Sequence, residues 1–63
     1  MKIDKYEIII ETYGKTAIFE IKGSRFTANR IYKFCCKNAN MIEDIEAIFL
    51  AKNNNIIKQY DID

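Results

Sequence analysis

Positive charge is concentrated in one stretch of the sequence, residues 23–38 (GSRFTANRIYKFCCKN). Residues 22–42 have a net charge of +5 and no acidic side chain, whereas residues 1–21 carry −1 and residues 43–63 carry −3. Arg30, Lys33 and Lys37 follow the spacing of a helix and would form one solvent-facing stripe. Such a stripe can contact phosphates or an acidic protein surface, or it can be an ordinary solvated helix face paired with neighbouring acids.

The start of this stretch has the residue types of an anion site. Ser24, Arg25 and Thr27 stand where backbone N–H groups and the helix dipole both favour a negative charge, so they could hold a phosphate oxygen. The candidate residues for binding an anion or a nucleic acid are Ser24, Arg25, Thr27, Arg30, Lys33 and Lys37.

Residue types for catalysis or metal binding are scarce. The chain has no histidine, and its two cysteines, Cys35 and Cys36, are adjacent. A cysteine nucleophile would lack its usual base, and two cysteines alone make a poor metal site. Adjacent cysteines cannot join distant segments by a disulfide. We therefore expect a non-enzymatic protein with no catalytic residue, no cofactor and no metal site, in the reducing cytoplasm.

Two strands should precede the basic stretch. Residues 5–12 (KYEIIIET) and 16–22 (TAIFEIK) are rich in isoleucine and alternate as strands do. Tyr13 and Gly14 form a two-residue connection between them, which predicts a hairpin. The stretch from Gly23 to Asn38 is then the single helix, capped by Ser24 or Thr27 and ending near Asn38.

The second half of the chain is less distinct. Residues 41–52 (MIEDIEAIFLAK) fit a helix capped by Asn40 or a strand, and the strand is favoured. Residues 53–55 are three asparagines, a strong turn signal, and residues 56–62 (IIKQYDI) resemble a partner strand. The fold class is therefore α+β: a small single domain, residues 1–63, of order ββαββ, with a four-stranded, mainly antiparallel sheet and one helix on one face.

One helix covers only one face of such a sheet. The residues predicted to face the helix are Ile8, Ile10, Ala17, Phe19, Ile21, Ala47, Phe49, Ile56 and Tyr60. The residues predicted to form an apolar row on the other face are Ile9, Ile18, Ile48, Leu50 and Ile57. A row that crosses a sheet indicates an interaction surface, and a small domain gains much of its stability by covering one. We expect this face to mediate back-to-back packing in a homodimer or higher oligomer, or contact with a partner.

The overall expectation is a small oligomeric binding protein. Ile, Lys, Asn, Tyr and Phe account for 35 of the 63 residues, which indicates a low-GC genome. A phage or mobile-element protein that inhibits or modulates a host defence complex in the bacterial cytoplasm fits this origin and size. The alternatives are nucleic-acid binding through residues 25–37 and capture of a small phosphorylated ligand at the helix start. No apolar run approaches the ~20 residues of a membrane span, so no membrane partner is expected.

Overall fold

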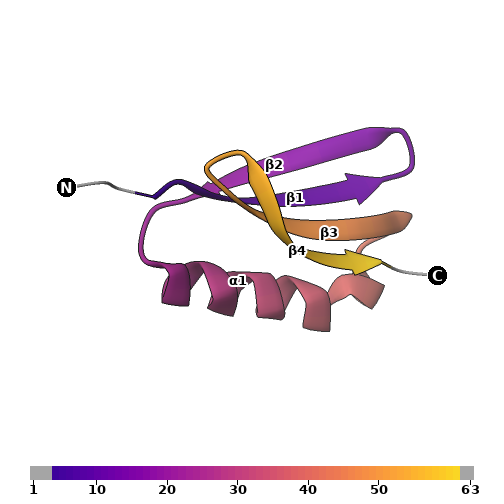
Figure 1. Ribbon diagram of the computed structural model, residues 1–63. Coiled ribbons are helices and arrows are strands. Elements are labelled where there is room, and N and C mark those ends of the chain that lie inside the picture. The colour runs from indigo at the N-terminus through magenta and orange to yellow at the C-terminus, as the bar shows by residue number, and fades with distance from the viewer. Residues whose placement is uncertain (1–3, 62–63) are drawn as a thin grey trace.

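The computed structural model describes residues 4–61 and has the predicted ββαββ order (Figure 1). Its elements are strand β1 (Tyr6–Thr12), strand β2 (Lys15–Ile21), helix α1 (Arg25–Lys37), the 3₁₀ turn η1 (Ala39–Met41), strand β3 (Ile45–Lys52) and strand β4 (Asn55–Asp61). The α+β fold class is confirmed. The strand interpretation of residues 41–52 is correct from Ile45 onward, whereas the preceding residues belong to η1 and its connection.

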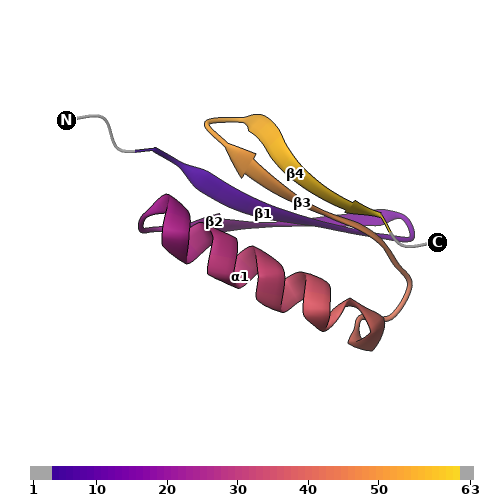
Figure 2. The same cartoon turned by 60° about the horizontal axis from the view of Figure 1, so that its bottom comes forward.

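The four strands form one antiparallel sheet in the order β2-β1-β3-β4. Two hairpins, β1–β2 and β3–β4, therefore lie side by side through β1 and β3, and β2 and β4 are the two edges. Helix α1 connects the hairpins and packs across one face of the sheet, against β1 and β3 (Figure 2). The opposite face is left uncovered, and we call it the open sheet face.

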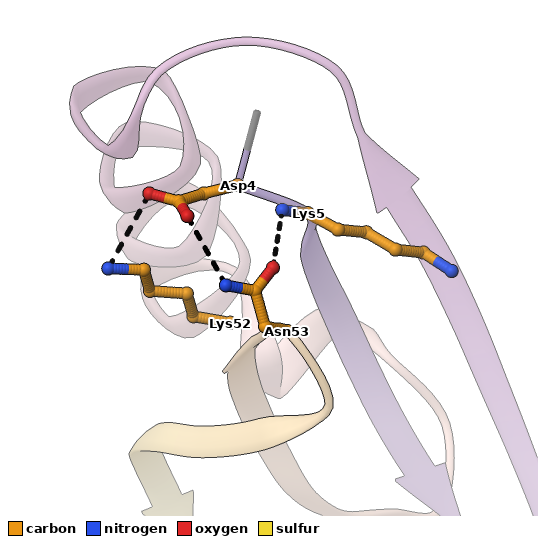
Figure 3. Close-up of polar contacts among 4 residues, drawn as sticks. All are labelled: Asp4, Lys5, Lys52 and Asn53. Atoms are coloured by element: carbon orange, nitrogen blue, oxygen red, sulfur yellow. Dashed lines mark hydrogen bonds and ion pairs between the residues drawn. The ribbon is translucent and has the colours of Figure 1, made fainter. Parts of the chain in front are cut away.

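The turn between β3 and β4 is built from asparagines, and it also contacts the two residues that precede β1. Asn53 and Asn54 both have positive φ, 50° and 70°, which is the backbone of a tight two-residue hairpin turn and suits asparagine. The Asn53 side chain accepts a hydrogen bond from the Lys5 N–H (2.9 Å) and donates one to Asp4 Oδ1 (3.2 Å). Lys52 Nζ lies 3.5 Å from Asp4 Oδ2 (Figure 3). The predicted asparagine turn is thus confirmed.

The core lies between α1 and the middle of the sheet. Its buried members are Tyr6, Ile8, Ile21, Ala28, Tyr32, Ala39, Ile48 and Leu50. Ile48 and Leu50 were predicted for the open sheet face, and that assignment is wrong because both are completely buried. The cause is register: Leu50 lies opposite Ile8, which faces the helix, and in a sheet such cross-strand partners share a face.

The same register moves the neighbours of these residues to the open sheet face. Phe49 lies opposite Ile9 and Ala47 opposite Glu11, so the prediction that Phe49 and Ala47 face the helix is also wrong. A one-residue change in phase exchanges every side chain of a strand between the two faces.

Strand β4 carries a β-bulge that changes its phase partway along. Leu50 pairs with Lys58, but Ala51 pairs with Ile56, so Ile57 is the extra residue. Ile56 therefore shares the face of Ala51, the open sheet face, and not the helix side as predicted. Lys58, beyond the bulge, faces the helix.

Candidate binding surfaces

The start of α1 uses its hydroxyl groups for capping. Ser24 Oγ accepts a hydrogen bond from the Thr27 N–H at 3.3 Å and lies 3.4 Å from Thr27 Oγ1. Gly23 precedes the cap with φ of 147°, a conformation that favours glycine. The structure thus brings two of the three predicted anion-site residues together, with Arg25 beside them and exposed. Their contact accounts for the helix start, and capture of a phosphate there stays a prediction.

The basic stripe of α1 is exposed as predicted. Arg30, Lys33 and Lys37 are all on the solvent side of the helix. The ion pairs found within residues 4–61 are Lys5–Glu20 and Lys52–Asp4, and neither involves a cation of α1. In the described part of the chain, the helix charges are therefore available to an anionic partner.

Two aromatic side chains accompany these cations and were missed by the sequence interpretation. Phe26 and Phe34 are 70% and 68% exposed, whereas Ala28 and Tyr32 of the same helix are buried. Phe34 also lines a shallow pocket of about 330 Å³ with Thr27, Arg30 and Ile31. Helical spacing in the sequence could have identified both phenylalanines as exposed, because they lie off the helical stripe that contains Ala28.

The open sheet face carries an apolar row that runs straight across three strands. Ile18 of β2 lies opposite Ile9 of β1, which lies opposite Phe49 of β3. Ile18 is 59% exposed, and the other two are half-buried. Ile56 of β4, opposite Ala51, extends the apolar surface beside this row. Of the five residues predicted for this face, Ile9 and Ile18 lie on it, and Ile57 is the exposed extra residue of the β4 bulge. Phe49 was missed.

Acidic side chains border the row on β1 and β2. Glu7 and Glu20 are direct cross-strand partners, and Glu11 follows the row on the other side. Like charges placed directly opposite destabilise a sheet. Lys5 Nζ lies 3.9 Å from Glu20 and offsets part of this repulsion. We call the row Ile18–Ile9–Phe49 together with Glu7, Glu11 and Glu20 the sheet surface.

A small titratable cluster lies between α1 and β4. Burial and a hydrogen bond with Cys36 raise the pKa of Tyr32 to about 12, and Asp61 and Tyr60 add to the effect. The Lys58 ammonium lies 5.9 Å from the centre of the Tyr32 ring, within reach of a cation–π interaction. Burial also raises the pKa of the Cys35 thiol, which lowers its thiolate fraction at neutral pH and makes it a weak nucleophile.

Because the pKa of Tyr32 is raised, we expect the free energy of unfolding to fall in alkali. Its pKa is near 10 in the unfolded chain and about 12 in the fold, so folding favours the protonated form. The stabilisation is complete below pH 10 and should disappear between about pH 10 and pH 12, by about 2–3 kcal/mol. Urea unfolding at several pH values measures this, and Tyr32→Phe should flatten the slope above pH 10. If the free energy of unfolding of Tyr32→Phe falls as steeply above pH 10 as that of the wild type, Tyr32 is not the group responsible.

Within residues 4–61, no three cysteine or acidic side chains gather closely enough to hold a metal ion. No helix within this range is long and apolar enough to cross a membrane.

No protein-family model matches the sequence, and neither the curated proteins nor the solved structures include a significant match.

Proposed function

We propose that this protein is a non-enzymatic binding protein whose sheet surface contacts a partner protein. The observation that carries the proposal is the apolar row Ile18–Ile9–Phe49, which crosses three strands on the face opposite α1. Isolated exposed apolar residues are common, but a contiguous row with a polar border is typical of interaction sites.

The acidic border indicates the chemistry of the partner. Glu7, Glu11 and Glu20 would oppose a phosphate backbone and attract lysine or arginine side chains. The fitting partner is therefore a protein with an apolar patch bordered by basic residues. Each 100 Å² of apolar surface that the contact covers contributes about 2.5 kcal/mol before the costs of association, and pairing with the acidic border adds to it.

The same border disfavours the expected back-to-back homodimer. Two sheet surfaces packed against each other would bring glutamates of both copies together in a partly desolvated interface, where like charges cost free energy. A different protein is the better occupant. A phage or mobile-element protein that blocks a host complex is the biological role that the small size and low-GC composition support.

Nucleic-acid binding through α1 is the second candidate. Exposed Phe26 and Phe34 lie among the cations Arg30, Lys33 and Lys37, and none of these cations pairs with a carboxylate of residues 4–61. Aromatic side chains that stack on bases, next to cations that contact phosphates, are the usual equipment for binding single strands. Such binding would weaken steeply with added salt.

The test of the first candidate is partner capture by the protein and by a variant with a reversed acidic border, Glu7→Lys with Glu11→Lys. Captured proteins that survive nuclease treatment and are lost with the variant would support the sheet surface. Captured material that disappears with nuclease, and is unaffected by the variant, would favour α1 and a nucleic acid.

A further inference from the structure

The two edges of the sheet differ in how well they are protected against pairing. Strand β4 has a β-bulge, and its Lys58 points inward over the Tyr32 ring. Bulges and inward-pointing charges are the devices by which natural proteins block edge-to-edge association. The β4 edge is therefore protected.

Strand β2 has no bulge, and its two charged residues, Lys15 and Glu20, are both exposed. It pairs with β1 over seven consecutive residues without a register shift, and its sequence KTAIFEI contains no proline. Every residue from Lys15 to Glu20 is exposed, and the large apolar Ile18 and Phe19 point to opposite faces at 59% and 55% exposure. Its straight, extended course at the side of the sheet is visible in Figure 1. Such an edge is a template for another strand.

The hairpin register shows which backbone groups of β2 are free. Thr12 and Lys15 close the two-residue turn, so Lys15 exchanges hydrogen bonds with β1. Alternate residues of an antiparallel strand bond to opposite neighbours. Thr16, Ile18 and Glu20 therefore direct their N–H and C=O groups away from the sheet.

We propose that two copies of this chain pair antiparallel through their β2 edges, with Ile18 at the twofold axis. Ile18 is the middle residue of Lys15–Ile21, so this register pairs all seven residues of both strands. Thr16 then lies opposite Glu20 of the second copy, and Ala17 opposite Phe19 of the second copy. No like charges meet, and a large side chain lies beside a small one on the helix side.

The self-complementary register is the reason to assign the edge to a second copy. Moving the axis to Ala17 would leave Glu20 opposite the turn residue Gly14, and moving it to Phe19 would leave Thr16 opposite Lys22, outside the strand. The centred register also joins the two apolar rows into one across the open sheet face, because Ile18 of each copy becomes the neighbour of the other. This inference concerns the β2 edge and does not depend on the partner proposed for the sheet surface.

Sedimentation equilibrium from micromolar to several hundred micromolar concentration tests the pairing. The wild type should be a monomer–dimer system, and Ile18→Pro should raise the dimer Kd at least tenfold because proline lacks the outward N–H. Circular dichroism confirms that the variant is folded. A wild type that stays monomeric throughout, or a dimer that the proline leaves unchanged, would overturn the proposal.

Disulfide trapping tests the register without relying on proline. In a chain with Cys35→Ser and Cys36→Ser, Ile18→Cys should form a dimer on mild oxidation, because paired Cα atoms at that position lie about 5.5 Å apart. Thr16→Cys and Glu20→Cys should cross-link when mixed and not when alone. The matched control Ile56→Cys, equally exposed on the protected edge, should remain monomeric. Equal trapping at Ile56→Cys, or no trapping at Ile18→Cys, would refute pairing between copies.

Discussion

Replacing Ile48 by alanine should lower the free energy of unfolding by about 2–4 kcal/mol, whereas replacing Ile56 by alanine should lower it by less than about 1 kcal/mol. The chemical change is the same at both positions. Ile48 is 0% exposed beneath α1, and Ile56 is 56% exposed on the open sheet face. Truncation of a buried isoleucine loses transfer free energy and leaves a cavity, but truncation of an exposed one does neither.

The consequence of the Ile48 change should be severe because the domain is small. Its total stability is expected to be only about 3–9 kcal/mol, so the variant should be close to unfolded at 37 °C. Urea unfolding followed by circular dichroism measures both variants. Equal losses at the two positions would mean that β3 does not present Ile48 to the helix.

Reversing the acidic border should separate folding from binding. In Glu7→Lys with Glu11→Lys, the first change replaces the like-charged pair with Glu20 by an attractive one, which should stabilise the fold by a few tenths to about 1 kcal/mol. The same changes place positive charge where a basic partner must dock, so partner affinity should fall at least tenfold. A variant that is more stable and yet fails to bind cannot be explained by misfolding.

The matched control is Glu43→Lys with Asp44→Lys, which alters net charge equally at two exposed residues of the connection between η1 and β3. It should retain binding. If both double variants lose the partner to the same degree, the effect comes from net charge, and the sheet surface is not the contact. If neither loses it, the partner binds elsewhere.

Much of the local structure could be predicted because particular residues determine it. Ser24 caps α1, Asn38 follows its last residue, and Gly14 takes the positive φ of the first turn. The pair Asn53–Asn54 does the same for the second turn. These features depend on backbone preferences of one or two residues, so they can be deduced from sequence.

The phase of β3 could not be deduced in this way. Residues 47–51 (AIFLA) are apolar without alternation, so either set of side chains could face the helix. The choice is made by pairing with β1, whose residues are distant in sequence. The hydrogen bond from the Tyr13 N–H to the Asp44 carbonyl lies at one end of this pairing. The β4 bulge at Ile57 similarly arises from pairing and not from a residue type.

The surfaces were predicted in part. Charge position along α1 is a property of sequence, so the basic stripe was identified correctly. The exposed Phe26 and Phe34 beside this stripe were missed. Aromatic residues are usually expected in a core, and only the helical spacing of each one shows that these two lie outside it. The open sheet face was expected, but two of its five proposed residues are in the core and Phe49 replaces them.

Photo-cross-linking in the native host tests the central claim most directly. A benzophenone side chain is placed at Gln59, the β4 neighbour of Phe49 at the end of the apolar row, and separately at Lys33 on α1. The sheet surface predicts a discrete protein adduct from position 59 that is absent from position 33 and is lost with Glu7→Lys and Glu11→Lys. Adducts from position 33 alone, and above all adducts with nucleic acid, would contradict the claim.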